Sequence, residues 1–154
     1  MDVKYINPFI VATTHVLDTL AHIETQPGKP FIKKDKIARG DVTGVIGLTG
    51  KMRGTISVSF SEPCILSIVS GMFGEEMKEM NEEIRDAVGE ISNMISGQAR
   101  RALEDGELSL QAAIPTVIMG KNHSLSHITT YPVIAIPFKT PKGDFTIEVS
   151  FEEG

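Results

Sequence analysis

Five residues on one side of a predicted helix have the types and the spacing to act on another macromolecule. They are Asp86, Glu90, Asn93, Gly97 and Arg101. Successive members lie four, three, four and four residues apart, so in a helix that turns about 100° per residue they project in one direction. A carboxylate can attract a cation of a partner, and a carboxamide donates and accepts hydrogen bonds without adding charge. We call these five residues the outward stripe.

Glycine is unusual on the exposed face of a helix, because each one costs up to about 1 kcal/mol relative to alanine. Gly97 lies on the outward stripe and Gly89 lies near it. A glycine close to Asn93 lowers the steric profile of the helix, so another macromolecule could approach while Glu90 and Asn93 protrude into it. The residues by themselves leave one alternative open, a solvated face with two incidental glycines.

The helix that carries the outward stripe is predicted over residues 82–105. Asn81 is suited to cap its N-terminus, and acidic residues in the first turn, Glu82 and Glu83, complement the helix dipole. Gly106 stands where a C-terminal stop belongs. The predicted core face consists of Ile84, Val88, Ile91, Ile95, Ala99 and Ala102.

The rest of the chain is predicted to form two further helices and several antiparallel strands. Helical periodicity covers 7–24, and a short helix covers 62–73, with Ser61 as its N-cap and Gly74 at its end. The other predicted elements are a three-stranded unit of 31–37, 42–48 and 55–60 with a hairpin loop at 50–54, an extended passage over 108–119, and a final hairpin of 126–138 and 144–151.

The two halves of the chain show an internal repeat. When the segments 46–62 and 134–153 are aligned with an offset of 91 residues, the same residues recur at aligned positions. In the first segment they include Ile56, Val58, Ser59, Phe60 and Glu62, and in the second they include Ile147, Val149, Ser150, Phe151 and Glu153. Upstream, with an offset of 86 residues, Asn7 falls opposite Asn93 and Lys4 falls opposite Glu90. Because a lysine reverses the charge of Glu90, we expect one complete copy of the outward stripe.

These elements predict one α+β domain over residues 1–154, with a pseudo-repeat of about 4–62 and 90–153. Its two pseudo-symmetric helix-plus-strands halves would form an antiparallel or mixed β-sheet. Two long helices would pack on one face of the sheet, accompanied by a shorter helix.

Composition excludes several function classes. The chain carries a net charge of −5 with a pI near 5.4, which argues against nucleic-acid binding because that requires clustered Lys and Arg. Apolar runs are too short to cross a membrane, and the N-terminal segment lacks the features of a signal peptide. The single cysteine, Cys64, predicts a reducing cytoplasm and a buried, unreactive thiol.

Metal, nucleotide and serine-hydrolase chemistry have little support in the sequence. The histidine pairs His15 with His22 and His123 with His127 lie in different halves, without a cysteine or carboxylate cluster beside them. We therefore predict ordinary histidines and no metal site. Phosphate-loop, dinucleotide-binding and nucleophile-elbow motifs are missing from the sequence.

The helix and its surroundings resemble a known family. Asp86, Glu90 and Asn93 stand within the run DAVGEISNM, and Pro115 follows in IPTV. This pattern is similar to the signature of the CheC/CheX/FliY phosphatases of bacterial chemotaxis. The single complete copy, the chain length and the element order resemble the CheX branch, over essentially the whole chain.

The resemblance implies a phosphatase that acts on the phosphorylated aspartate of the response regulator CheY. The regulator would supply the phosphate, Mg²⁺ and an active-site lysine, so the chain would need no cofactor of its own. Asn93 would orient the attacking water, Glu90 would pair with the regulator's lysine, and Asp86, Gly97 and Arg101 would contact the partner. The resemblance also implies a homodimer formed by joining sheets.

An alternative reading uses the same helix face without hydrolysis. A non-catalytic module could dock a response regulator or a flagellar-switch protein through the outward stripe. This alternative shares the fold and the partner surface, and only an assay of phosphate loss separates it from the phosphatase.

Overall fold

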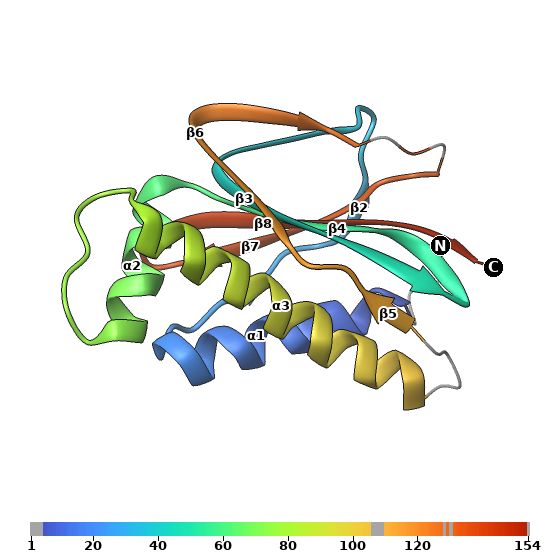
Figure 1. The fold of residues 1–154 in the computed structure, drawn as a ribbon, viewed down its shortest axis with the longest axis horizontal. Helices are drawn as coiled ribbons and strands as arrows, with labels where there is room; N and C mark the ends of the chain where they lie inside the picture. The colour runs from blue at the N-terminus through green and yellow to red at the C-terminus, as the bar shows by residue number, and fades with distance from the viewer. Residues whose placement is uncertain (1–4, 106–109, 128, 130, 154) are drawn as a thin grey trace.

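A helical layer covers one face of an antiparallel sheet in the computed structural model, which describes residues 5–105, 110–127, 129 and 131–153 (Figure 1). The long helices α1 (Asn7–Ala21) and α3 (Glu82–Asp105) lie side by side under the sheet. The shorter helix α2 (Glu62–Phe73) packs at one end of this layer. The predicted α+β class, with two long helices on one face and a shorter third, is confirmed.

The described strands form one eight-stranded sheet. Its order is β1-β7-β8-β4-β3-β5, with β2 also paired to β7 and β6 also paired to β3, and every pairing is antiparallel. In chain order the strands are β1 (Gln26–Pro27), β2 (Phe31–Ile32), β3 (Ile37–Gly50), β4 (Met52–Phe60), β5 (Leu110–Ala112), β6 (Thr116–Ser126), β7 (Ile134–Thr140) and β8 (Gly143–Glu153).

The prediction of a strand over 31–37, paired within the first three-stranded unit, is wrong. Phe31–Ile32 forms the separate short strand β2, which pairs with β7, and Ile37 is already the first residue of β3. Asp35 Oδ1 accepts the backbone N–H of Ile37 at 3.0 Å, a local turn that interrupts the extended run. The third partner in that unit is β6, with β5 beside the end of β3.

Two element boundaries also differ from the prediction. The first helix ends at Ala21 and not at residue 24, because His22 adopts the left-handed conformation with φ of 55°. The last hairpin is formed by β7 and β8, so the strand predicted over 126–138 begins only at Ile134. Of the extended passage predicted over 108–119, residues 108 and 109 lie outside the described residues, as does Gly106, the predicted helix stop.

Helix α3 covers the predicted range, and Asn81 caps it: Asn81 Oδ1 accepts the backbone N–H of Ile84 at 3.2 Å. One member of the predicted core face is wrong. Ala102 is exposed and Leu103 is buried. The residue that follows Ala99 on the buried face is therefore four positions further on, at Leu103. This spacing places leucine in the core, the larger of the two apolar side chains.

Close packing of α3 on the sheet fixes which side of the helix faces outward. A side chain at Gly44 of β3 would collide with the buried Ser92 of α3, so the glycine permits the helix to approach the strand. Ser92 Oγ donates to the carbonyl of Val88 at 2.7 Å, which satisfies the hydroxyl inside the core. The opposite side of α3, with the outward stripe, is left at the surface.

The start of α2 is held by Asp41. Ser61 stands at the predicted cap position but makes no side-chain cap hydrogen bond. Asp41 Oδ2 instead accepts the backbone N–H of Glu62 at 2.7 Å, and Oδ1 accepts that of Asn122 at 2.9 Å. These two hydrogen bonds hold the pKa of the Asp41 carboxyl below its usual value, and the bond from Asn122 has the larger effect.

We expect Asp41→Ala to lower the free energy of unfolding by about 1 kcal/mol at pH 7, the usual loss for a removed helix cap. Because the folded-state pKa is lowered, this stabilisation is present above the unfolded pKa, about 3.9, and is lost as the pH falls through the folded pKa. Urea unfolding at several pH values measures both effects. A matched control is Asp144→Ala, which removes an exposed carboxylate nearby. Equal stability of the unchanged protein and Asp41→Ala at pH 7 would contradict the capping role.

Candidate functional site

The outward stripe lies on the surface of α3, as its spacing predicts. Asp86, Glu90, Asn93 and Arg101 are exposed, and Gly97 is half-buried. The buried residues of the same helix face the sheet and α1. The structure thus aligns all five residues along one side of a single rigid element.

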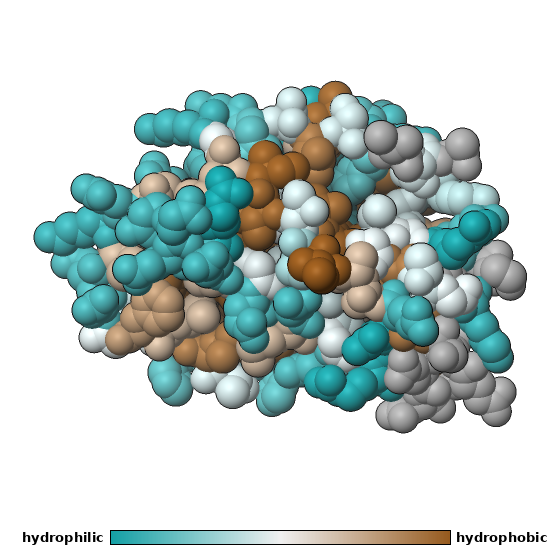
Figure 2. Space-filling view, viewed as in Figure 1, coloured by the Kyte–Doolittle hydropathy of each residue, from teal (hydrophilic) through white to brown (hydrophobic). Residues whose placement is uncertain are grey.

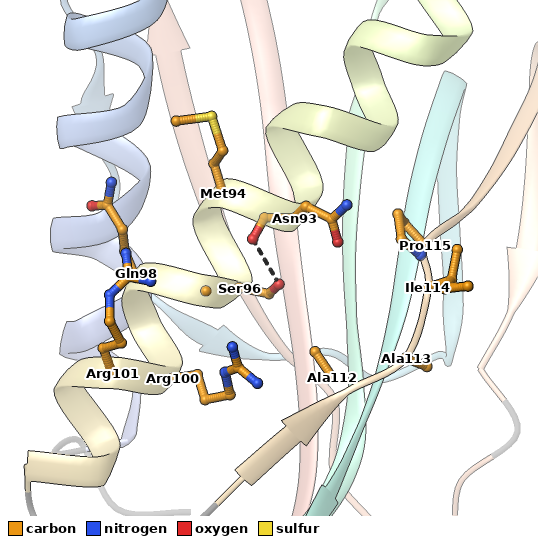
Figure 3. A pocket seen from close by; sticks show the side chains of 11 residues that line it. Asn93, Met94, Ser96, Gln98, Arg100, Arg101, Ala112, Ala113, Ile114 and Pro115 are labelled. Carbon is orange, nitrogen blue, oxygen red and sulfur yellow. Dashed lines mark hydrogen bonds between the residues drawn. The ribbon is translucent and has the colours of Figure 1, made fainter.

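The side-chain amide of Asn93 is available to a partner. No described residue hydrogen-bonds this amide, although the backbone carbonyl of Asn93 accepts the hydroxyl of Ser96 at 3.1 Å. The side chain points from α3 toward Pro115 (Figure 3). Since its backbone belongs to the middle of a 24-residue helix, the direction in which the side chain leaves the helix is fixed, and the amide groups stay free to bind a partner.

A second wall of the site is formed by the segment 110–117, which links β5 to β6 alongside α3. Arg100 Nη1 donates to the carbonyl of Leu110 at 3.4 Å, and Arg85 Nη1 donates to that of Val117 at 3.0 Å. The N–H of Ala113 donates to the carbonyl of Gly47 in β3 at 2.9 Å. These bonds, together with the pairing of β5 and β6 with β3, hold this segment to the helix and the sheet.

A hollow of about 490 Å³ separates the two walls (Figure 3). One side of the hollow is lined by Asn93, Gly97 and Arg101 of the outward stripe, together with Arg100. The other side is lined by residues 112–115. Glu90 lies one helical turn from Asn93, and Asp86 lies a further turn away, outside the hollow. The structure brings three stripe residues to the hollow and leaves the two carboxylates beside it.

The two carboxylates of the outward stripe are unpaired. Within the described residues, neither Asp86 nor Glu90 has a Lys, Arg or His nitrogen within 4.0 Å of its oxygens. Arg85 instead lies 3.8 Å from Glu82. An unpaired carboxylate on a rigid helix can meet a cation of a partner without first breaking an internal ion pair.

The two glycines of this surface are not required by internal packing. A Cβ atom at Gly97 would lie 3.7 Å from Arg101 Nη1, and one at Gly89 would lie 3.6 Å from Val117 Cγ2, both ordinary contacts. Alanine would therefore fit and would favour the helix by up to about 1 kcal/mol at each position. Packing within the fold therefore does not explain these glycines.

Three of the four histidines make internal side-chain contacts, and the cysteine is buried. His123 Nε2 lies 2.7 Å from Thr43 Oγ1, His127 Nε2 lies 3.0 Å from Glu148 Oε1, and His15 Nδ1 lies 3.0 Å from Gln98 Oε1. Across the described residues, no three His, Cys, Asp or Glu side chains gather in a way that could hold a metal ion. Burial raises the pKa of the Cys64 thiol to about 11, so the thiol is protonated and unreactive at neutral pH.

Sequence reasoning missed the two arginines that hold the second wall. Arg85 and Arg100 lie on the flanks of α3, outside both the core face and the outward stripe. Their partners are backbone carbonyls far along the chain. Helical periodicity contains no signal for such bonds.

Comparison with known proteins identifies the family. The sequence profile of the family described as chemotaxis phosphatase CheX matches residues 42–139, well over half of the chain. The chain belongs to this family.

Relatives match it over nearly their whole length. A CheY-P phosphatase CheX from Thermotoga maritima is 29% identical over 157 residues, covering 100% of this chain and 99% of that protein. The crystal structure of a chemotaxis protein CheX from Desulfovibrio desulfuricans is 49% identical, with a TM-score of 0.92, over 96% of this chain and 99% of that one.

A third relative was crystallised with a partner. The Borrelia burgdorferi CheX in a CheX-CheY-BeF3-Mg²⁺ complex is 24% identical, with a TM-score of 0.78, over 97% of this chain and 98% of that one. At this identity the likeness concerns the fold. In the described part of our chain, no helix has the length and apolar character needed to pass through a membrane.

Proposed function

We propose that this protein hydrolyses the aspartyl phosphate of a CheY-type response regulator. The main support is the exposed amide of Asn93, which projects from the middle of a long helix and has no hydrogen-bond partner among the described residues, in a chain of the CheX family. The Thermotoga maritima relative is a CheY-P phosphatase, and the Borrelia burgdorferi relative binds CheY in its crystal structure. Both relatives support the same substrate.

The reaction requires little more than a correctly placed water molecule. The water oxygen forms a bond to phosphorus while the bond from phosphorus to the aspartate oxygen breaks, giving inorganic phosphate and a free carboxylate. Asn93 Oδ1 accepts a hydrogen bond from this water, and the amide NH₂ donates to the phosphoryl group. Phosphoryl transfer is catalysed mainly by positioning and electrostatics, so a neutral amide suits the task.

Glu90 positions the partner in this proposal. Its unpaired carboxylate forms an ion pair with the active-site lysine of the regulator and fixes the register of the two surfaces. Asp86 and Arg101 extend the contact along α3, and Gly97 gives clearance. Divalent magnesium belongs to the regulator, where it neutralises phosphoryl charge, and the presence of Mg²⁺ with CheY in the Borrelia burgdorferi complex supports this assignment.

We also propose that the two halves of the chain are a pseudo-repeat, with Asn7 at the position that corresponds to Asn93. The pairing of β4 with β8 supports it. Ser57 pairs with Glu148, which is the residue that corresponds to it in the repeat because it lies 91 residues further on. The neighbouring pair is Ile56 with Val149. This register fits a two-fold axis between the halves. Lys4, opposite Glu90 in the alignment, lies outside the described residues.

The cellular setting follows from the substrate. A response regulator of chemotaxis works in the cytoplasm, which we therefore propose for this protein. We further propose a homodimer that joins sheet edges, supported by the exposed apolar side chains of Phe31 and Ile32 on edge strand β2.

The decay of a phosphorylated CheY-type regulator in Mg²⁺ tests the function. Adding this protein in catalytic amount is expected to shorten the half-life of the phosphorylated regulator well below its spontaneous value. Binding to the phosphorylated regulator without faster decay would overturn the phosphatase and favour the non-catalytic docking module.

Gly97 gives a prediction about clearance. We expect Gly97→Ala to raise the free energy of unfolding by up to about 1 kcal/mol and Gly97→Leu to lower kcat/KM for the phosphorylated regulator by about tenfold or more, since misplacement by about 1 Å can cost about 100-fold in rate. Thermal unfolding and the decay assay measure the two effects. Full activity of a folded Gly97→Leu variant would show that clearance is not the reason for the glycine.

A further inference from the structure

We propose that Ile114 is a specificity-determining residue that anchors the response regulator beside Asn93. This inference rests on the proposed function and adds to it an apolar contact from a different element. Ile114 lies in the connection between β5 and β6, on the wall of the hollow opposite α3 (Figure 3).

The exposure of Ile114 is unusual. Its side chain is 89% exposed, the largest value among the exposed large hydrophobic residues of the described chain. Apolar atoms gather on this face of the molecule, along the path of β6 and the β5–β6 connection (Figure 2). Val117 and Met119 of β6 are half-buried and pack against the core, so Ile114 is the exposed large apolar residue of this stretch. An isolated exposed aliphatic residue is common, but one within a patch at the rim of a candidate site marks a protein contact.

The position of Ile114 is fixed before any partner arrives. The N–H of the preceding residue, Ala113, is bonded to Gly47 of β3, and the segment is tied to α3 by Arg100 at Leu110 and by Arg85 at Val117. The following residue is a proline, whose φ is restricted. A residue whose backbone is already held loses little backbone entropy on binding, so its apolar contact contributes more fully to affinity.

Asn93 and Ile114 line the same hollow from its two opposite walls. The amide of Asn93 points toward Pro115, the neighbour of Ile114 in the chain (Figure 3). A regulator that receives this amide in its phosphorylated pocket and spans the hollow would also meet the β5–β6 connection. Glu90 contacts the regulator from α3 and Ile114 from the opposite wall, so the two residues set its orientation on both sides of the amide.

The chemistry of the contact identifies what the regulator supplies. An isoleucine on a rigid connection offers branched apolar surface and no hydrogen-bonding group, so its counterpart is an apolar or aromatic side chain beside the regulator's phosphorylation site. A buried apolar anchor next to polar catalytic contacts is the usual arrangement of an interface hot spot. A regulator with a polar residue at that place would be a poorer substrate.

The experiment compares three variants in two assays. Ile114→Asp and Ile114→Leu are assayed with Val11→Asp, a control at a valine that is 67% exposed on α1. Affinity is measured by calorimetry with a CheY-type regulator activated by BeF₃⁻ and Mg²⁺. Turnover is measured with the phosphorylated regulator, and sedimentation of each variant alone reports its oligomeric state.

We expect Ile114→Asp to raise the dissociation constant and KM about tenfold or more, with a much smaller change in kcat. Ile114→Leu should retain most of the affinity, and Val11→Asp should match the unchanged protein in affinity. Unchanged affinity of Ile114→Asp, with normal catalysis by the unchanged protein, would overturn this inference alone. A change confined to the sedimentation of Ile114→Asp would also overturn it and assign the residue to self-association. Absence of both binding and turnover in the unchanged protein would overturn the proposed function as well.

Discussion

Replacing Asn93 by alanine is expected to lower kcat for regulator dephosphorylation by about 100-fold or more. The amide is the group proposed to orient the attacking water, and removing one positioned hydrogen-bonding group from a transition state commonly has an effect of about 100- to 1000-fold. The fold should be unaffected, because Asn93 is exposed and its side chain has no hydrogen-bond partner among the described residues. Alanine also has a higher helix propensity than asparagine.

The decay of the phosphorylated regulator measures this effect, and Asn7→Ala is its matched control. Asn7 is an exposed asparagine at the start of α1, at the corresponding position of the proposed pseudo-repeat. The same substitution there should leave turnover as it is in the unchanged protein. Near-normal turnover by a folded Asn93→Ala variant would reject the proposed role of the amide.

Reversing the charge of Glu90 is expected to have the second largest effect. Glu90→Lys would place a cation opposite the regulator's lysine, so the ion pair would be lost and replaced by repulsion. We expect the dissociation constant for the regulator activated by BeF₃⁻ to rise at least tenfold at low salt. Because the contact is electrostatic, the difference from the unchanged protein should shrink as ionic strength rises.

Glu24→Lys controls for net charge in this measurement. Glu24 is an exposed carboxylate that lines a separate hollow beside α1, and its reversal changes the total charge of the protein by the same amount. Affinity that falls equally in both variants would show a general charge effect and would contradict a specific ion pair at Glu90.

The surface of α3 could be predicted from the sequence because it depends on local geometry. The backbone of a helix fixes the direction of each side chain relative to its neighbours, so the spacing from Asp86 to Arg101 was sufficient to place the outward stripe on one side. The cap at Asn81 is local as well. The one error on the core face, Ala102 in place of Leu103, arose near the end of the helix, where a step of three or four residues fits the pattern almost equally.

The second wall of the site could not be predicted because it depends on pairing between distant segments. The sequence indicates that 110–117 is largely extended, but it does not indicate that β5 and β6 share one edge of β3 or that they run alongside α3. The same limit explains the error at 31–37, where a short strand pairs with β7, more than 100 residues away. Alternation of apolar residues identifies a strand without identifying its neighbour.

A crystal structure of this protein in complex with a CheY-type regulator, BeF₃⁻ and Mg²⁺ would show directly where Asn93 lies in the complex. We expect the Asn93 amide to enter the regulator's active site, within hydrogen-bonding distance of the BeF₃⁻ group on the side opposite the modified aspartate. A complex in which the regulator docks elsewhere, or in which Asn93 lies outside the phosphorylation pocket, would contradict it.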